Sequence, residues 1–486
     1  MSDAGNVSQQ SESAVAAALR AKVKHAIGLH QQGKIADAER VYSEVLQQQP
    51  NHFDALHLLG VIAAQTQRSE HAIELIQKAI ALNANVAAAH NNLGNALRNL
   101  RRFEDALASY EKAIALTPDY PEAYNNRGLA LIALSRPQDA SASFGRAIAL
   151  KPEYAEAYGN QALCLLLLGW FEQGWRQLEW RKKPPMLVAA RSYSQPSWLG
   201  EEDIAGKTLF LWWEQGLGDT IQFCRYAKLA EARGAKVVMS VQHPLTNLMK
   251  QLSPTIEIIG PDDVPTEFDY HAPLMSLPYS FRTTLEAVPA ERPYLKVSDQ
   301  QRQAWAARLP AKGKREDGKL KPRVGLVWSG GMGPNHAGFW WVNSRRNISL
   351  AKLSVLKGLD VEFYSLQKGQ PAEAELPELI RQRWDGPEIA DFAGQIKDFS
   401  DTAALIENLD LVISVDTSTA HLAGALGKPV WILNRFDTCW RWLLERTDSP
   451  WYPTVKLYRQ QKAGEWDDVI QRVRNDLMHF RSGAAC

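Results

Sequence analysis

The first third of the chain repeats with a period of 34 residues, and this period limits the possible folds more than any other feature. A small residue recurs at one phase, a glycine at a second, and a large apolar residue at a third. These sets are Ala38, Ala72, Ala106, Ala140 and Gly174; Gly60, Gly94 and Gly128; and Tyr42, Ile76, Tyr110, Phe144 and Leu178. Such a period is typical of a helix pair that stacks on copies of itself, with small residues where the helices cross closely.

The repeat is identified as the tetratricopeptide repeat. Pro50, Pro118 and Pro152 close three of its units, and Ala84 stands where the second unit would have its proline. We expect about five units over residues 19–185, which form an N-terminal α-solenoid. Residues 1–18 are polar and are expected to form a flexible tail.

Asparagines recur at one phase of the array: Asn92, Asn126 and Asn160, here called the asparagine ladder. We expect them on the first helix of each pair, which faces the concave groove of such arrays. Asparagine both donates and accepts hydrogen bonds, so the ladder can hold an extended peptide backbone without selecting its side chains. The alternative is that asparagine is simply common at this phase of the repeat. Either way, a protein partner in the groove is expected.

The chain changes character after the array, and all 16 tryptophans lie at or after Trp170. Strand and helix patterns then alternate, with strands expected at 207–213, 236–241, 324–328, 361–366, 411–415 and 430–433. Residues 311–322 are mostly charged and lack an apolar face, which indicates a linker. We expect a two-lobed α/β enzyme with an N-terminal lobe at 186–310 and a C-terminal lobe at 323–486, closed by an amphipathic helix. Its cleft would lie between the carboxyl ends of both sheets.

Residues 410–429 contain the most informative strand-to-helix turn. A buried apolar run ends at Asp416, Thr417 and Ser418, a helix rich in small residues begins at Thr419, and Gly427 ends that helix. Backbone N–H groups at a helix N-terminus and three hydroxyls suit an anion such as a sugar-nucleotide phosphate. An ordinary capped helix is the alternative.

The turn after the first expected strand contains Gly216, Gly218 and Asp219. Glycines there let a substrate approach the backbone closely. Asp219 is either an N-cap or a general base that faces the cleft.

Composition and motif searches exclude several other functions. Lys plus Arg is 55 against 54 for Asp plus Glu, so no strong field favours nucleic acid or an anionic membrane. The four cysteines are scattered, no apolar run is long enough to span a bilayer, and no basic-then-apolar leader is visible, so we expect a cytoplasmic protein. No Asp-x-Asp or clustered Cys/His set is present to hold a metal.

Without a metal, a bound diphosphate needs cationic side chains. The candidates are Arg345, Arg346 and Lys368, with plain surface charge as the alternative reading. The aromatic residues of 440–442 and 451–452 either stack on a ligand or pack in the core.

The α/β part, over about residues 205–460, resembles the bacterial heptosyltransferase-like glycosyltransferases, which have the two-lobed GT-B fold. Gly218-Asp219 is similar to that family's Gly-Asp, whose aspartate is thought to be the catalytic base. Residues 416–429 are similar to its nucleotide-sugar motif, which implies donor binding by Asp416, Thr417, Ser418, Thr419 and His421. Here Ser418 replaces the usual glycine, and Gly424 replaces an alanine.

The combined layout resembles the repeat-fused transferases that bacteria use on proteins, including those that glycosylate flagellin. It is also analogous to the O-linked N-acetylglucosamine transferase, whose asparagine-lined repeats hold the acceptor. The resemblance implies a metal-independent, inverting transfer from a nucleotide sugar to a Ser or Thr hydroxyl, with no cofactor. Two alternatives stay open: an enzyme acting on a saccharide or lipid-linked acceptor, and a scaffold whose transferase lobes are degenerate.

Overall fold

The computed structural model describes residues 3–184, 191–291, 293–331 and 345–480. The chain forms two compact units, Met1–Cys164 and Leu165–Cys486, here called the repeat unit and the α/β unit. In these described ranges no helix is both long and apolar enough to cross a membrane.

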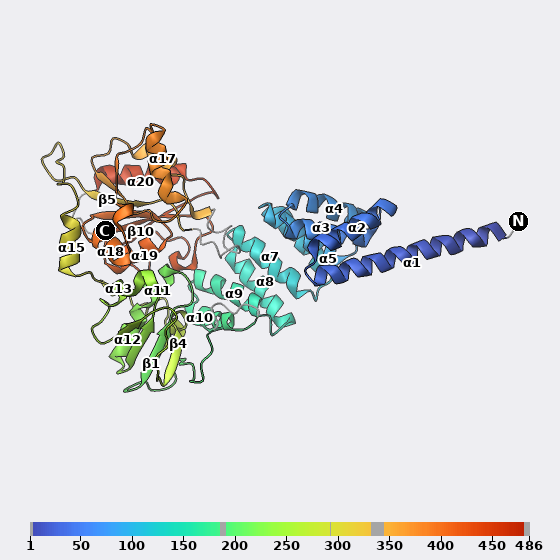
Figure 1. Cartoon of the computed structure of the whole chain (residues 1–486), viewed down its shortest axis with the longest axis horizontal. Coiled ribbons are helices and arrows are strands. Elements are labelled where there is room, and N and C mark those ends of the chain that lie inside the picture. Colours follow the sequence, from blue (N-terminus) through green and yellow to red (C-terminus); the bar gives the residue numbers. More distant parts are fainter. Residues whose placement is uncertain (1–2, 185–190, 292, 332–344, 481–486) are drawn as a thin grey trace. The chain divides into compact units, whose positions relative to one another are not determined.

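Helix pairs build the repeat unit (Figure 1). Its helices are α1 (Asp3–Gln31), α2 (Ile35–Gln48), α3 (Phe53–Gln65), α4 (Ser69–Leu82), α5 (Ala87–Asn99), α6 (Phe103–Leu116), α7 (Pro121–Ala133), α8 (Pro137–Leu150) and α9 (Ala155–Leu167), the last of which crosses the boundary between the units. The periodic glycines allow each pair to close. A Cβ on Gly94 would lie 2.5 Å from the ring of Tyr110, and one on Gly128 would lie 2.5 Å from the ring of Phe144. The glycine of the first helix therefore faces the large apolar residue of the second.

The segment expected to form a flexible tail, residues 1–18, is helical from Asp3 onward as the first part of α1. The segment lacks proline, and five of its 18 residues are alanine, which favours a helix. Val15 is still 57% exposed, and Leu19 is the first buried residue among those whose side chains the structure describes.

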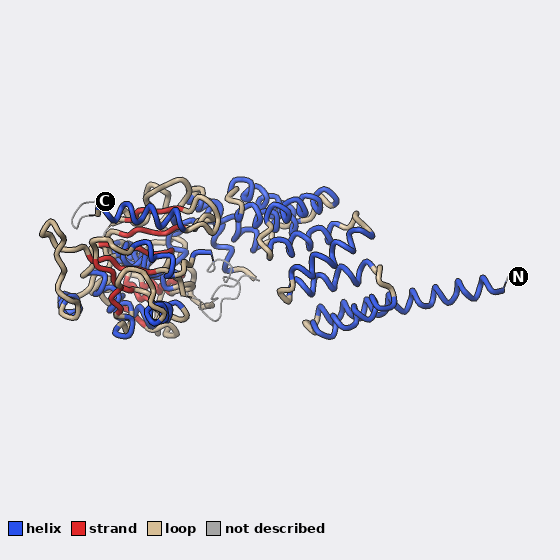
Figure 2. The backbone as a smooth tube through the Cα atoms, turned by 90° about the horizontal axis from the view of Figure 1, so that it is seen from above, coloured by secondary structure: helices blue, strands red, loops and turns tan. Residues whose placement is uncertain are grey.

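The first of two sheets in the α/β unit is small and parallel, and it forms the N-terminal lobe. Its strands are β1 (Thr208–Trp212), β2 (Lys236–Ser240), β3 (Glu257–Ile259) and β4 (Tyr270–Pro273), in the order β3-β2-β1-β4. Helices α11 (Leu217–Phe223) and α12 (Arg225–Ala232) connect β1 to β2, and α13 (Thr246–Met249), α14 (Leu277–Ser280) and α15 (Asp299–Ala306) follow. Figure 2 shows the strands of the α/β unit in red.

The C-terminal lobe is a six-stranded parallel sheet in the order β10-β9-β8-β5-β6-β7. Its strands are β5 (Arg323–Val327), β6 (Glu362–Ser365), β7 (Ile389–Asp391), β8 (Leu411–Val415), β9 (Val430–Asn434) and β10 (Val455–Arg459). Its helices include α17 (Ala372–Arg381), α18 (Phe399–Glu407), α19 (Ser418–Ala425) and α20 (Asp467–His479). This is the doubly wound order in which the connection reverses between β5 and β8, where such sheets bind ligands.

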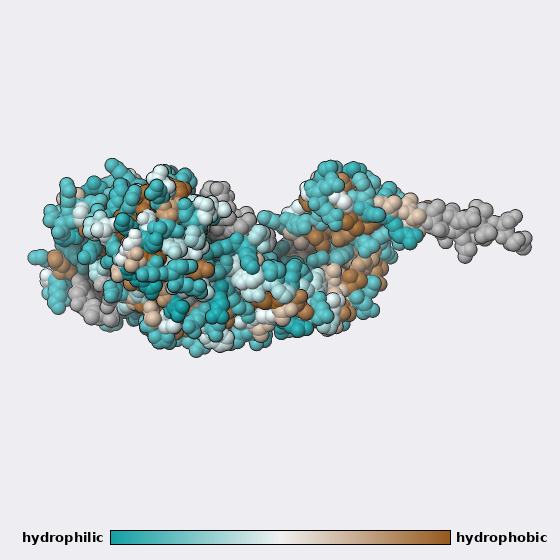
Figure 3. All heavy atoms as spheres, turned by 90° about the horizontal axis from the view of Figure 1, so that it is seen from below, coloured by the Kyte–Doolittle hydropathy of each residue, from teal (hydrophilic) through white to brown (hydrophobic). Residues whose placement is uncertain are grey.

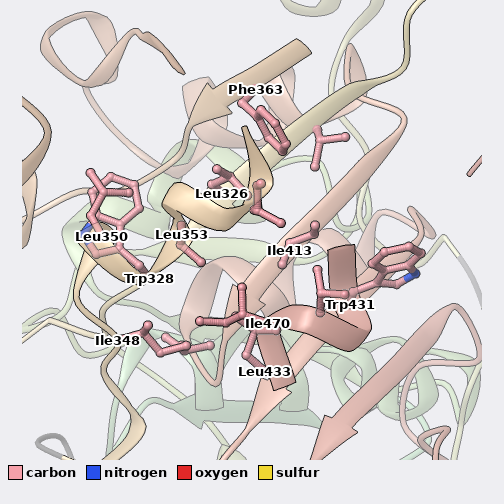
Figure 4. Packing of buried hydrophobic residues seen from close by; sticks show 14 of the residues in the cluster. Leu326, Trp328, Ile348, Leu350, Leu353, Phe363, Ile413, Trp431, Leu433 and Ile470 are labelled. Atoms are coloured by element: carbon pink, nitrogen blue, oxygen red, sulfur yellow. The ribbon is translucent and has the colours of Figure 1, made fainter. Parts of the chain in front are cut away.

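The closing helix α20 covers one face of this sheet. Its apolar residues pack with those of the strands and of the 3₁₀ segment η5 (Leu350–Leu356). Figure 4 shows Ile470 beside Leu433 and Ile413 in this core. Parallel strands covered on both faces explain the nearly unbroken apolar runs in the sequence.

The expected linker at 311–322 forms a short antiparallel turn, with a bridge between Lys314 and Leu320. Its charges are used within the C-terminal lobe: Lys312 pairs with Asp410 at 2.7 Å, and Lys321 with Asp360 at 3.1 Å. Opposite charges on the neighbouring lobe thus give the segment a fixed course that its lack of an apolar face does not predict.

The last expected repeat divides between the units. Helix α10 (Phe171–Leu178) and the 3₁₀ turn η1 (Glu179–Lys182) lie in the α/β unit. The ring of Trp175 meets that of Trp440 edge to face at 5.2 Å, and Phe171 stacks on Trp451 at 6.0 Å. The division falls here because the large aromatic residues of α10 pack into the core of the enzyme fold.

Candidate active site

Residues 416–419, here called the hydroxyl turn, lie at the carboxyl end of β8. Thr417 is the N-cap of α19, and its Oγ1 accepts a hydrogen bond from the Ala420 N–H at 3.4 Å. Gly427 follows the end of α19 with φ of +76°, a conformation that glycine adopts without strain. The turn thus has the ordinary helix cap of the alternative reading, with the helix beginning at Ser418, and it also lies at the ligand-binding edge of the sheet.

Residues 216–219, here called the acidic turn, lie at the carboxyl end of β1 in the other lobe. Gly216 is the N-cap of α11, and its N–H donates to Asp219 Oδ2 at 2.9 Å. Asp219 therefore acts as a helix cap through one of its two oxygens. The second oxygen, Oδ1, is left for another partner.

The two turns meet across the lobes, since α11 packs against α19 (Figure 1). A Cβ on Gly218 would lie 2.9 Å from Cδ2 of His421 and 3.5 Å from Cα of Ser418. Any side chain at position 218 would therefore separate the lobes. The glycine of the Gly-Asp pair is required for this close approach.

A cavity of about 570 Å³ opens beside this contact and is lined by both turns. Among the described residues its polar and charged lining includes Asp219, Ser329, Arg346, Gln367, Lys368, Lys397, Asp398, Asp416, Thr417, Ser418, Thr419, His421 and Arg441. Its volume is in the range of small-molecule sites. The site residues predicted on both lobes, except Arg345, thus line one space.

His421 lies at the centre of this arrangement and is 5% exposed. Its Nδ1 is 2.8 Å from the hydroxyl of Tyr452, and its ring stacks on Trp442 at 5.5 Å. Burial lowers the pKa of His421 to about 3, although Asp416 acts in the opposite direction. The imidazole is therefore neutral at physiological pH, and its ring forms a fixed part of the cavity lining.

Two of the three predicted cations line the cavity. Arg346 Nη1 donates to the Asp416 carbonyl at 2.9 Å, and Lys368 Nζ donates to the Ala393 carbonyl at 2.6 Å. Burial lowers the pKa of Arg346 from its ordinary value, against the attraction of Asp416. Arg345 is not among the lining residues, because its guanidinium pairs with Asp437 at 2.6 Å.

Gln367 organises the loop after β5, which also lines the cavity. Its Oε1 accepts from the N–H of Ser329 at 2.9 Å, and its Nε2 donates to the Ser329 carbonyl at 3.0 Å. Gln367 is 2% exposed, so both ends of its amide are used for positioning. The sequence pattern alone assigned no role to this residue.

Arg441 also lines the cavity, and the sequence pattern did not single it out. Its Nη2 forms an ion pair with Asp219 Oδ1, and its Nε donates to Gln222 Oε1 at 2.6 Å. Burial acts to lower the pKa of Arg441, but the net shift is upward because Asp219 and Cys439 stabilise its charge. The sequence signal was an arginine between Trp440 and Trp442, and both of these tryptophans are buried.

The asparagine ladder joins successive repeats. Asn126 Nδ2 donates to Asn91 Oδ1, and Asn160 Nδ2 donates to Asn125 Oδ1, each at 3.0 Å. Asn92 Nδ2 is 2.9 Å from Nε2 of His57. His57 lies 34 residues before Asn91, so it has the position in its repeat that Asn91 and Asn125 have in theirs. The ladder residues are half-buried, so they have a structural role whether or not they also contact a peptide.

A metal site is not formed by the side chains that the structure describes. Within these ranges no group of three or more His, Cys, Asp or Glu residues is placed to hold an ion. The cysteines described are Cys164, Cys224 and Cys439, and each is a free thiol.

Comparisons with known proteins agree with this layout. Residues 23–87 and 125–172 match the tetratricopeptide repeat model, and residues 94–135 match a second repeat model of that kind. Residues 349–433 match glycosyltransferase family 9 (heptosyltransferase). The matched stretch contains the hydroxyl turn and His421, whereas the acidic turn precedes it.

Protein FlbA of Caulobacter vibrioides is 29% identical over 343 residues, which is 65% of this chain and 54% of FlbA. The chain thus spans about half the length of this curated relative. Among solved structures, MamA is 25% identical with a TM-score of 0.30 and covers 32% of this chain and 91% of its own. Pseudomonas aeruginosa PilF is 21% identical with a TM-score of 0.32 and covers 36% and 78%.

Proposed function

We propose that this chain, which carries tetratricopeptide repeats and a glycosyltransferase family 9 domain, transfers a sugar from a nucleotide sugar to a Ser or Thr hydroxyl of a protein. The observation that carries the proposal is the cavity of about 570 Å³ that both turns line. It combines a carboxylate from the N-terminal lobe with hydroxyls, backbone N–H groups and cations from the C-terminal lobe. Such a set can hold a donor phosphate and a reacting hydroxyl at the same time.

In the proposed step, the acceptor oxygen attacks the anomeric carbon from the side of Asp219. The bond from that carbon to the phosphate oxygen breaks, and its electron pair stays on the departing nucleotide. The hydroxyl proton moves to the Asp219 carboxylate. Attack from the side opposite the leaving group gives inversion at the anomeric carbon.

Cations and a helix N-terminus are proposed to replace a metal in this step. Arg346, Lys368 and Arg441 line the cavity, and α19 directs its first N–H groups toward it. Stabilisation by 1 mM ADP, UDP, GDP or CMP in a thermal-shift assay should therefore be equal with magnesium and with EDTA. Stabilisation that requires magnesium or manganese would contradict the metal-independent mechanism.

The repeat unit is proposed to recruit the protein acceptor, in the cytoplasm. Figure 3 shows patches of hydrophobic residues on this unit in the view from below, and such patches are typical of protein-binding surfaces. Flagellin is the first acceptor to test, because the layout resembles repeat-fused transferases that act on it. Mass spectrometry of flagellin incubated with enzyme and donor should find a hexose- or heptose-sized addition on Ser or Thr. Transfer only to saccharide acceptors would favour the alternative function.

The role of Asp219 is tested by Asp219→Asn. Asparagine still accepts the Gly216 N–H bond but cannot take the proton, so turnover should fall by about 10²-fold or more. Asp263→Asn is the matched control, because Asp263 Oδ2 accepts the Gly260 N–H at the same 2.9 Å and lies outside the cavity lining. The control should keep normal turnover. Normal turnover in Asp219→Asn would show that Asp219 is only a cap.

A further inference from the structure

The ion pair between Arg441 and Asp219 joins the two lobes inside the cavity. Arg441 is on the short turn η7 (Trp440–Trp442) of the C-terminal lobe, and Asp219 is on α11 of the N-terminal lobe. The two side chains are only 12% and 19% exposed. An ion pair this sheltered is screened less by salt than a surface pair.

Both partners are held in place by further contacts. The guanidinium of Arg441 lies 4.3 Å from the Trp440 ring centroid and donates through Nε to Gln222. The Asp219 carboxylate accepts from Gly216 through its other oxygen. As long as the pair is formed, each oxygen of Asp219 already accepts a hydrogen bond, and Oδ1 is in direct contact with the positive guanidinium of Arg441.

The charges that line the cavity are nearly balanced. The described lining residues include four cations, Arg346, Lys368, Lys397 and Arg441, and three carboxylates, Asp219, Asp398 and Asp416. A diphosphate adds at least two negative charges, which is more than the single unbalanced positive charge can neutralise. A bound diphosphate therefore competes with the lining carboxylates for the same cations.

Arg441 is the cation best placed for this exchange. Lys368 already donates to a backbone carbonyl and Arg346 to the carbonyl of Asp416, and neither bond blocks a reacting group. Arg441 instead occupies the carboxylate that the proposed reaction needs. Guanidinium also pairs with phosphate oxygens through two parallel hydrogen bonds, which makes a diphosphate a strong competitor for it.

We propose that Arg441 is shared between Asp219 and the donor diphosphate, so that donor binding releases Asp219 to act as the base. The inference rests on the proposed function for its substrate, a nucleotide sugar. Before the donor binds, the pair holds the lobes and blocks the carboxylate. After it binds, the guanidinium neutralises the diphosphate, and Asp219 faces the acceptor hydroxyl. An acceptor bound without the donor would therefore find Asp219 still paired with Arg441.

Removing the carboxylate on one lobe should then strengthen anion binding on the other. Affinities of the full-length protein for ADP, UDP, GDP and inorganic pyrophosphate are measured by titration calorimetry in four forms: wild type, Asp219→Asn, Arg441→Gln and the double variant. Asp219→Asn should raise the affinity for the best-binding diphosphate by about 10-fold, because Arg441 no longer has a competing partner. Arg441→Gln should lower it by about 10-fold or more.

The double variant separates competition from simple repulsion. If Asp219 only repels the anion, its removal raises the affinity by the same factor with or without Arg441. If the two compete for Arg441, the gain is lost in the Arg441→Gln background. An equal gain in both backgrounds, or no gain in either, would overturn the proposal.

A control variant tests whether loosening of the lobes alone has this effect. Asn247 of the N-terminal lobe donates to Asp398 of the C-terminal lobe at 2.7 Å, without touching Arg441. Asn247→Ala should give no gain in diphosphate affinity, and a gain equal to that of Asp219→Asn would overturn the proposal. If Arg441→Gln does not fold, as judged by circular dichroism, Arg441→Lys replaces it, because an ammonium group lacks the planar pair of N–H donors that guanidinium presents to two phosphate oxygens.

The probes also distinguish this proposal from the proposed function. If pyrophosphate shows the full pattern while no nucleotide binds, the exchange of Arg441 stands and the nucleotide-sugar donor is wrong. If a nucleotide binds and the double variant shows no coupling, the exchange is wrong and the donor stands. If neither probe binds the wild-type protein, both are overturned.

Discussion

Gly218→Ala is the sharpest test of whether the two turns must touch for the enzyme to work. The new Cβ would lie 2.9 Å from Cδ2 of His421. His421 cannot turn aside easily, because its Nδ1 bonds the hydroxyl of Tyr452 at 2.8 Å and its ring stacks on Trp442. The strain should therefore be relieved by separation of the two lobes at this point.

The structure sets the size of the effect. Carbon atoms in contact prefer about 3.5–4.0 Å, so the turns must move apart by roughly 0.6–1.1 Å. A misplacement of about 1 Å can reduce turnover by roughly 10²-fold. Stability should change less, because overpacking costs about 1–3 kcal/mol, and replacing a helical glycine with alanine returns up to about 1 kcal/mol.

The assay compares kcat with the free energy of unfolding in the same variant. Gly394→Ala is the control: Gly394 is exposed in the same unit, and a Cβ on it would have no atom within 4 Å, so neither quantity should change. Gly218→Ala should lose roughly 10²-fold in kcat and at most about 2 kcal/mol in stability. Wild-type kcat in Gly218→Ala would refute the reasoning, because it would show that the close approach of the lobes is not needed.

Three further outcomes follow from the structure. Gly424→Ala should lower the stability of the α/β unit by about 1–2 kcal/mol in chemical unfolding, because its Cβ would lie 2.5 Å from the ring of Tyr452; unchanged stability would show that Tyr452 repacks at no cost. His421 should cost the wild-type protein about 2 kcal/mol of folding stability between pH 6.5 and pH 5, because its pKa in the folded state is about 3 and only the unfolded chain takes up the proton in that window. His421→Asn should remove this loss of stability. An equal loss in wild type and variant would contradict the effect of burial on His421. Replacing the asparagine ladder with alanine should weaken acceptor binding and lower the free energy of unfolding of the repeat unit by about 1 kcal/mol for each lost bond. The double variant Asn91→Ala with Asn125→Ala removes the buried partners of Asn126 and Asn160, and so breaks two of the same bonds without changing the ladder itself. If it lost as much acceptor affinity as the ladder variant, the ladder would not contact the acceptor.

Local patterns in the sequence predict most of the fold. The predicted strand at 411–415 coincides with β8, and Gly427 has the left-handed conformation expected after a helix. Both follow from interactions close in sequence: an apolar run buried on two faces, and a backbone angle that favours glycine. The 34-residue period also predicts the helix pairs, because the contact of Gly94 with Tyr110 recurs between Gly60 and Ile76 and between Gly128 and Phe144.

The contacts that complete the candidate site are distant in sequence and leave no local signal. Arg441 and Asp219 are separated by 222 positions, and the pair depends on how α11 and α19 approach each other. The hydrogen bonds of the asparagine ladder between repeats leave a partial signal in the sequence. Asn126 and Asn91 are 35 positions apart, which is one repeat plus one residue. The helix at the N-terminal segment and the ion pairs of the linker at 311–322 could not be predicted, because polar segments can be ordered by propensity or by ion pairs without an apolar face.

Helix α10 has a consequence for how such enzymes can be recombined. Arg181, just after α10, forms two hydrogen bonds at 2.6 and 2.7 Å with Glu214, and each side chain is only 2% exposed. Glu214 lies two residues before the acidic turn. Arg181, at the end of the last repeat, therefore holds in place the segment from which the acidic turn begins. A chimera that joins a foreign array to this enzyme at residue 185 would remove Arg181 and bury an unpaired carboxylate, at a cost of several kcal/mol. Grafts made before Leu165 keep this pair, so repeats can be added, lost or exchanged on that side while the final helix is inherited with the enzyme.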